Sequence, residues 1–330
     1  MNLDRVFGER LAQSGGACKI CRMAILLNPH GNASPWAARF AALAPDLEIR
    51  TLPELGNLAD IDVAAVAQAP PGLLATLPNL KLICSLMAGQ EGLLSDPKLP
   101  RHVPIVRSAD PAGDPMMNEV ALLHVLRHHR HMPDYLLSQQ RREWKQMPRT
   151  KAAERKVGVM GLGIIGLAVA KTLKQNGFIV AGWARKPRTL EGIETYHGDD
   201  QLAAFLGRSE IVVNLLAMTR ETTDILCART FSQMPKGASV INLARGQHVV
   251  DADLVAAIES GHLAGATLDV FRTEPLPKES ALWAQPRITI MPHVARRIDP
   301  ADVVPCVIDQ VRRLQRGEPL VHLVDRAAGY

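Results

Sequence analysis

The sequence predicts an α/β fold with two Rossmann-like domains, one flavodoxin-like and one dinucleotide-binding, whose parallel sheets face a cleft between them. Three observations support this prediction. Apolar runs of strand length alternate with amphipathic runs of helix length, which is typical of crossover connections between parallel strands. The chain has 330 residues, more than one typical domain. A glycine-rich turn near its middle opens a second strand–helix series.

The first half of the chain contains five strand-length apolar runs. They are Met23–Leu27, Leu47–Leu52, Val63–Ala67, Leu80–Leu86 and Pro104–Arg107. Between the first two, Ser34 precedes Pro35, which predicts a helix with Ser34 as its N-cap and Pro35 at its first position, running to about Leu43.

A helix from about Met116 to His131 is predicted next, because apolar residues recur there at helical spacing. The polar, basic stretch 139–155 follows it and predicts the crossing into the second domain. The strands expected after that crossing are Lys156–Met160, Phe178–Trp183, Ile211–Leu215, Ser239–Ile241, Ala266–Leu268 and Ile288–Ile290.

The final amphipathic stretch, about Ala301–Leu314, predicts a helix that packs back on the first domain. The second domain is therefore expected to be inserted into the first. We assign residues 1–114 and 299–330 to a substrate-binding, catalytic domain and residues 115–298 to an NAD(P)-binding Rossmann domain.

Composition limits the classes of function. Hydrophobic residues make up 47% and charged residues 22% of the chain, and the formal charge is +5. This mild excess does not indicate a nucleic-acid-binding surface, but it suits anionic cofactors and carboxylate substrates. The longest apolar run, 157–170, is too short to span a membrane, and the charged segment 4–10 argues against a secretory signal. A cytoplasmic protein is expected.

The five cysteines are an odd number, which favours a reducing compartment. Cys18 and Cys21 have the spacing of a metal clip but no second Cys or His pair nearby, so inert thiols are favoured over a metal or redox site. Residues 1–22 read as a loose extension, or as the product of an early start codon. No metal is expected.

The glycine-rich turn has the G-x-G-x-x-G pattern, follows a strand and opens a helix. The motif comprises Gly161, Leu162, Gly163, Ile164, Ile165 and Gly166. One glycine permits the tight turn, the next lets the backbone approach a pyrophosphate, and the last allows close packing of helix on strand. The helix N-terminus then binds the phosphates. Dinucleotide binding is favoured over a merely glycine-rich turn.

The end of the following strand bears on the choice between NAD and NADP. An NAD enzyme usually has Asp or Glu there to bind the ribose 2′-hydroxyl, whereas this chain has Arg185, Lys186 and Arg188. Arginine binds a 2′-phosphate with several donors. NADP(H) is therefore preferred and NAD(H) remains possible; a solvated basic loop is the alternative.

Three polar side chains follow three later strands. Arg245 comes just past one apolar strand, Glu274 follows another through a proline-rich loop, and His293 ends a third. Because ligands bind beyond the carboxyl ends of such strands, the three are expected to meet. An arginine that polarises a carbonyl, and a histidine that protonates it, held by a carboxylate, suit keto-acid reduction. Singly, each residue could instead be a structural ion pair, a loop acid or an ordinary histidine.

From Met23 onward the chain resembles the D-2-hydroxyacid dehydrogenase family, and within it the branch of glyoxylate and hydroxypyruvate reductases. Asn242–Gly246, Leu268–Pro277 and Pro292–Ala295 are similar to its three catalytic blocks, and 183–186 is similar to its NADP-using members. The resemblance implies NADPH-dependent reduction of small 2-keto acids such as glyoxylate and hydroxypyruvate. It also implies a homodimer formed through the linking helices.

The same resemblance implies roles for individual residues. Arg245 would bind the substrate, His293 would donate the proton and Glu274 would be its partner. The backbone N–H groups of Ala88 and Gly89 would bind the substrate carboxylate. The cofactor would be lined by Leu216, Ala244 and Asp269, with 215–218 bordering the adenosine and Asp269 facing the nicotinamide.

The chain departs from the family pattern at Met87, Leu52, Gln90–Glu91 and Arg296–Arg297. The two arginines would lie either near the substrate or at a domain or dimer surface. These departures leave the substrate open, so a larger 2-keto acid stays an alternative, as does a non-enzymatic NAD(P)H-sensing regulator.

His124 and His128 are four residues apart on a predicted helix, a spacing that can bind zinc. No acid lies between them in the metalloprotease arrangement. A solvated or interface position is favoured over a metal site.

Overall fold

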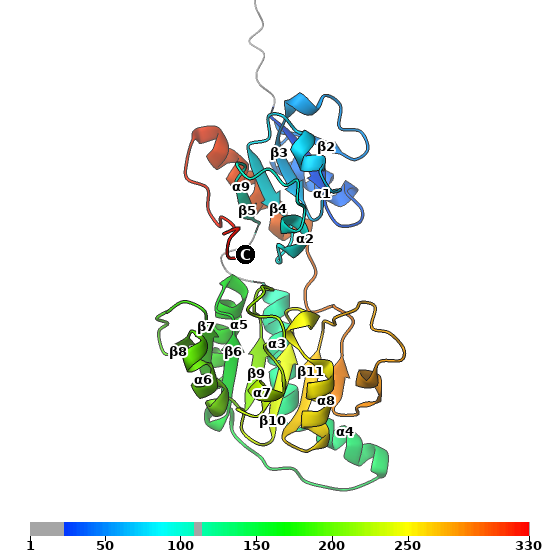
Figure 1. Ribbon diagram of the computed structural model, residues 1–330, viewed down its shortest axis with the longest axis vertical. Helices are drawn as coiled ribbons and strands as arrows, with labels where there is room; N and C mark the ends of the chain where they lie inside the picture. The colour runs from blue at the N-terminus through cyan, green and yellow to red at the C-terminus, as the bar shows by residue number, and fades with distance from the viewer. Residues whose placement is uncertain (1–22, 109–113, 330) are drawn as a thin grey trace, which may run out of the picture.

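Each lobe of the chain contains one all-parallel β-sheet (Figure 1). The structure is a computed structural model that describes residues 23–108 and 114–329. Within these residues the first sheet has the order β2-β1-β3-β4-β5. Its strands are β1 (Ala24–Asn28), β2 (Glu48–Thr51), β3 (Ile61–Val66), β4 (Leu82–Ser85) and β5 (Ile105–Arg107). This is the flavodoxin-like order, so the predicted fold of this lobe is confirmed.

The second sheet has the order β12-β11-β10-β9-β6-β7-β8. Its strands are β6 (Lys156–Met160), β7 (Ile179–Ala184), β8 (Glu194–His197), β9 (Ile211–Asn214), β10 (Ala238–Asn242), β11 (Leu263–Leu268) and β12 (Ile288–Ile290). The chain reverses direction across the sheet between β6 and β9, which is the switch point of a dinucleotide-binding fold. The predicted α/β architecture with two parallel sheets is therefore confirmed.

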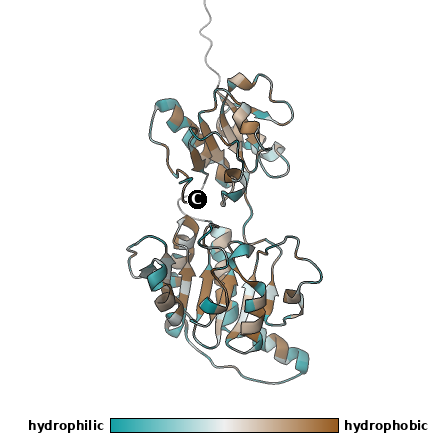
Figure 2. Cartoon of the chain, in the orientation of Figure 1, coloured by the Kyte–Doolittle hydropathy of each residue, from teal (hydrophilic) through white to brown (hydrophobic). Residues whose placement is uncertain are grey.

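Helices flank both sheets, and the strands form the apolar centre of each lobe (Figure 2). The helices are α1 (Ser34–Leu43), α2 (Glu91–Leu94), α3 (Pro115–His129), α4 (Met132–Arg141), α5 (Ile164–Gln175), α6 (Leu202–Arg208), α7 (Ala228–Phe231), α8 (Asp251–Glu259) and α9 (Pro300–Arg316). Short 3-10 turns lie at Leu58–Asp60, Leu73–Thr76, Ala152–Glu154, Asp199–Gln201, Gly246–His248 and Ala281–Ala284. No helix among the described residues combines the length and apolarity needed to cross a membrane.

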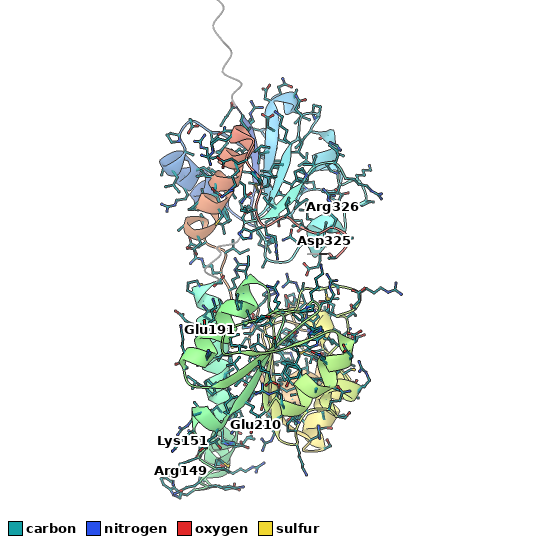
Figure 3. The ribbon with its side chains drawn as sticks, turned by 90° about the vertical axis from the view of Figure 1, so that its left-hand side faces the viewer. Arg149, Lys151, Glu191, Glu210, Asp325 and Arg326 are labelled. Carbon is teal, nitrogen blue, oxygen red and sulfur yellow. The ribbon has the colours of Figure 1, made fainter. Side chains whose placement is uncertain are left out.

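The C-terminal helix α9 returns to the first lobe, as the sequence predicted. Its buried valines, Val303, Val304, Val307 and Val311, share one apolar cluster with β1 and α1. The chain after α9 then pairs with β5, where Arg107 N–H donates to His322 O (3.0 Å). Asp325 and Arg326 follow, at the end of the first lobe that faces the second (Figure 3).

The N-cap prediction for α1 was wrong. The capping position is Ala33, and no side chain caps the helix there. Asn32 Oδ1 accepts from Ser34 N–H (3.0 Å), so a turn at Asn32 binds the N–H of the residue that was expected to be the cap. Pro35 is the second residue of the helix, one position later than predicted, and still lies in its first turn.

The predicted crossing at 139–155 was also wrong. Helix α3 already packs on the second sheet, because Met117, Ala121 and Val125 share an apolar cluster with Val157 and Ile241. The chain has therefore changed lobes before α3 begins. The polar stretch that follows α4 is an exposed connection within the second lobe, and its exposure explains its composition.

The histidines of α3 are buried, so the solvated position, one of the two that the prediction favoured, is wrong. His124 and His128 are 3% and 8% exposed, and His128 Nε2 lies 3.1 Å from Thr267 Oγ1 on β11. Burial lowers the pKa of His128 to about 3, so the ring is neutral near pH 7. Among residues 23–108 and 114–329, no three His, Cys, Asp or Glu are grouped to hold a metal ion. Cys18 and Cys21 lie outside the described residues.

Candidate active site

The turn between β6 and α5 has the shape of a dinucleotide cradle. Gly161 has φ +93°, and a Cβ on it would lie 2.6 Å from Leu215 O. A Cβ on Gly166 would lie 1.7 Å from Gly161 O. These two positions therefore require glycine, one for the turn and one for close helix–strand packing.

The middle glycine has a different environment. A Cβ on Gly163 would meet no atom within 4 Å. Helix α5 begins at the next residue, so the N–H groups of its first turn lack partners within the helix and face this end. Open space beside a helix N-terminus suits a pyrophosphate, and Leu162, Ile164 and Ile165 of the motif flank it.

The basic residues expected to select the cofactor lie just past β7. Arg185, Lys186 and Arg188 are all exposed, directly after the last residue of the strand. Glu221 lies in the loop that follows β9. Hydrogen bonds from the backbone N–H of Glu221 and from Thr219 lower the pKa of this glutamate, and the nearby positive charges of Arg185 and Arg220 lower it further. Arg185 therefore lies near the loop that follows β9, and the two loops border the same side of the sheet.

His293 and Glu274 are brought together, although β12 separates their loops in sequence. His293 Nδ1 lies 2.7 Å from Glu274 Oε2. The other carboxylate oxygen of Glu274 accepts the N–H of Phe271 (2.9 Å), which fixes the carboxylate from behind. The pair therefore holds Nδ1 on the carboxylate and leaves Nε2 as the nitrogen available to a substrate.

Asp269 braces the backbone around His293. It is 1% exposed, and its carboxylate accepts the N–H groups of Val294 (2.7 Å) and Ala295 (3.0 Å). Its carbonyl accepts the N–H of His293 (2.8 Å). His293 has φ +55°, a left-handed conformation that these three bonds maintain. Both oxygens of Asp269 are thus engaged by the loop that carries the histidine.

Arg245 lies at the end of β10 and reaches across to the first lobe. Its Nη1 donates to Ala244 O (2.7 Å), and its Nε lies 3.2 Å from Glu91 Oε1 at the start of α2. A Cβ on Gly89 would lie 1.9 Å from Arg245 Nη2. The loop Met87–Gly89 and Arg245 are therefore adjacent, as the substrate-site prediction requires.

A buried polar network supports the Arg245 turn, and the sequence interpretation did not include it. Asn242 Oδ1 accepts from Asn214 Nδ2 (3.0 Å) and from Ala244 N–H (3.2 Å), while its Nδ2 donates to Arg245 O (2.9 Å). Asn214 Nδ2 also lies 3.0 Å from His248 Nδ1. Burial lowers the pKa of His248 to about 4, so it stays neutral. The sequence signal for this network was an asparagine at the end of each of two adjacent buried strands, because a buried amide side chain needs hydrogen-bond partners.

Asn214 also fixes the loop that follows β9. Its Oδ1 accepts the N–H of Leu216 (3.2 Å), the residue expected to border the adenosine. One buried side chain thus connects the expected cofactor loop to the turn that carries Arg245.

Arg296 lies at the crossing between the lobes. It forms an ion pair with Asp114, which also caps α3 by accepting the N–H of Met117 (3.1 Å). This ion pair places Arg296 at the crossing between the domains, which is one of the positions considered for it. Two other departures from the family pattern are Leu52 and Met87. Leu52 is 37% exposed, and the carbonyl oxygen of Met87 accepts a hydrogen bond from Gln90 Nε2 (3.0 Å).

Comparisons with known proteins identify the family of the chain. A family model described as D-isomer specific 2-hydroxyacid dehydrogenase, NAD binding domain, matches residues 122–295. Glyoxylate/hydroxypyruvate reductase A of Salmonella heidelberg (strain SL476) is 38% identical over 313 residues, which is 93% of this chain and 99% of the relative.

Two solved structures have the same fold. A D-isomer specific 2-hydroxyacid dehydrogenase from Xanthobacter autotrophicus Py2, in complex with NADPH and MES, is 39% identical with a TM-score of 0.89, covering 93% of this chain and 99% of that one. An NADPH-dependent glyoxylate/hydroxypyruvate reductase from Sinorhizobium meliloti, in complex with NADP and sulfate, is 36% identical with a TM-score of 0.85, covering 93% and 100%.

The glycine turn makes a testable distinction between two substitutions. Gly163→Ala should fold normally, because its methyl group enters open space, but should weaken NADPH binding by about tenfold or more by blocking the pyrophosphate. Gly166→Ala should lower the free energy of unfolding by roughly 1–3 kcal/mol or more, since its methyl group overlaps a carbonyl. Thermal unfolding and NADPH fluorescence titration measure both effects. Equal loss of stability in the two variants would contradict the assignment.

Proposed function

Because the chain belongs to the D-isomer specific 2-hydroxyacid dehydrogenase family, we propose that it reduces glyoxylate and hydroxypyruvate with NADPH. The observation that carries this proposal is the His293–Glu274 pair, at 2.7 Å, on the same sheet edge as Arg245. Relatives named glyoxylate/hydroxypyruvate reductase A, and NADP-bound neighbours of the same fold, support the substrate and the cofactor.

In the proposed mechanism, Arg245 and the N–H groups of Ala88 and Gly89 bind the substrate carboxylate. Arg245 also stabilises the negative charge that develops on the keto oxygen. His293 Nε2 delivers a proton to that oxygen, and Glu274 stabilises the protonated ring through Nδ1. The nicotinamide supplies the hydride that adds to the carbonyl carbon. Because the site holds the substrate, the cofactor and the catalytic side chains in alignment, less entropy is lost on reaching the transition state.

NADPH preference is proposed from the end of β7. Residues 185–188 include no carboxylate that could bind the ribose 2′-hydroxyl of NADH, and exposed cationic side chains lie there instead. A 2′-phosphate would gain charge-assisted hydrogen bonds from Arg185 and its neighbours. NADH lacks that phosphate and would lose those contacts.

We also propose a homodimer formed through α3 and α4. Their outward faces expose large apolar side chains, among them Leu123 (57%), Leu126 (40%) and Leu136 (40%). Trp144, on the connection after α4, is 98% exposed. That connection runs to the end of the second lobe farthest from the first, where Arg149 and Lys151 lie (Figure 3). Large apolar side chains exposed on two consecutive helices are typical of an interface with another chain.

The proton-donor role predicts the behaviour of His293→Ala. Turnover of glyoxylate should fall by roughly two to four orders of magnitude, the usual contribution of a general acid, while NADPH affinity stays near that of the wild type. Steady-state kinetics and fluorescence titration measure the two quantities. Turnover close to wild type would assign the proton to another group.

The cofactor assignment predicts that Arg185→Ala raises the KM for NADPH by about tenfold or more and leaves the KM for NADH nearly unchanged. The comparison of both cofactors with one enzyme preparation controls for general damage. An equal rise for the two cofactors would rule out a contact with the 2′-phosphate.

The dimer proposal predicts a sedimenting species of twice the chain mass in the wild type. Leu123→Glu should shift it toward monomer, because the substitution introduces a charge into an apolar contact. Leu43→Glu, at a 44% exposed residue on α1, is the matched control and should leave the mass unchanged. A wild-type monomer at micromolar concentration would end this proposal.

A further inference from the structure

Glu91 occupies the candidate substrate site together with Arg245. It is the first residue of α2, two residues beyond the loop glycine Gly89. Its Oε1 lies 3.2 Å from Arg245 Nε, and the two side chains are 35% and 30% exposed. This ion pair joins the first lobe to the second at the point where the substrate carboxylate is proposed to bind.

The backbone of Gly89 lies against this ion pair. A Cβ on Gly89 would lie 2.2 Å from Glu91 Oε2 and 1.9 Å from Arg245 Nη2. The carboxylate, the guanidinium and the loop backbone therefore meet at one place. Glu91 therefore lies beside the guanidinium that is proposed to anchor the substrate.

The guanidinium is already partly engaged. Nε faces Glu91 and Nη1 donates to Ala244 O (2.7 Å), so two of its three nitrogens contact the protein. Nη2 is the nitrogen next to Gly89. Nη2 therefore faces the loop whose N–H groups are proposed to hold the substrate, and the Glu91 carboxylate lies beside the same nitrogen.

We propose that Glu91 is a specificity-determining residue that admits 2-keto acids with one negative charge and discriminates against those with a second. The inference rests on the proposed function, because it concerns the substrate of that site. A single carboxylate is accommodated by Arg245 and the loop N–H groups. A second carboxylate or a phosphate on the substrate carbon chain would lie near Glu91 and be repelled by it.

Repulsion between like charges is stronger where protein replaces part of the surrounding water, and the side chains of Glu91 and Arg245 are only 35% and 30% exposed. The substrate class that fits is glyoxylate, which has no C3, or a short 2-keto acid whose C3 carries only hydrogen or a neutral hydroxyl group. A hydroxyl group has the additional ability to donate a hydrogen bond to the carboxylate. Phosphorylated and dicarboxylic 2-keto acids are therefore expected to be poor substrates.

Glu91→Gln tests this inference, because it removes the charge and keeps the size of the side chain. The probes are glyoxylate and hydroxypyruvate, with one negative charge, and oxaloacetate and 3-phosphohydroxypyruvate, with more than one. Wild type should have a kcat/KM for the doubly charged acids at least about tenfold below that for hydroxypyruvate. The variant should reduce this ratio by about tenfold or more, mainly through KM.

Two further variants sharpen the result. Glu91→Asp retains the charge and should retain the wild-type preference for singly charged acids. Glu259→Gln, at the exposed C-terminal end of α8, makes the same chemical change away from the site and should leave all ratios unchanged. Glu91→Ala gives a second neutral side chain if the glutamine variant does not fold.

The outcomes separate this inference from the proposed function. If wild type reduces none of the four acids, the proposed function itself is wrong. If wild type reduces glyoxylate or hydroxypyruvate but the neutral variants change kcat/KM by one common factor for all acids, Glu91 is a structural ion-pair partner only and this inference is overturned.

Discussion

Parallel strands end at one edge of their sheet, and the candidate site exists because β10, β11 and β12 are neighbours there. Arg245 follows β10, Glu274 follows β11 and His293 follows β12. The strand order alone brings these three loops together, although about fifty residues separate the first from the last. The same edge carries the glycine turn after β6, so the cofactor cradle and the candidate catalytic residues share one rigid support.

Loops at such an edge need internal support to hold their side chains in place, and here buried polar groups provide it. Asp269 binds three consecutive residues from His293 onward, and Asn242 binds the turn of Arg245 from inside the sheet. Removing either polar group would leave buried N–H or C=O groups without partners, a cost of roughly 1–3 kcal/mol each. Support of this kind preserves the geometry that general acid catalysis and carboxylate binding require.

The sequence predicted well what local patterns determine. The alternation of apolar runs located the strands, Gly161–Gly166 predicted the cradle, and strand-end positions predicted that Arg245, Glu274 and His293 would be neighbours. The predictions that were wrong depended on contacts between residues far apart in the chain. The crossing between the domains was placed at 139–155 by composition, although α3 before it already packs on the second sheet, and the burial of His128 against Thr267 could not be read from its spacing. Likewise, the pairing of Arg296 with Asp114, and of Glu91 with Arg245, joins segments that only the folded chain brings together.

The most direct measurement is the rate of NADPH oxidation, followed by absorbance, by the wild-type protein with glyoxylate and with hydroxypyruvate, repeated with NADH. The account predicts turnover with both acids and a higher kcat/KM for NADPH than for NADH. Demonstrable NADPH binding without turnover of either acid would contradict it, and would show that the strand-end arginine, glutamate and histidine do not reduce these small 2-keto acids.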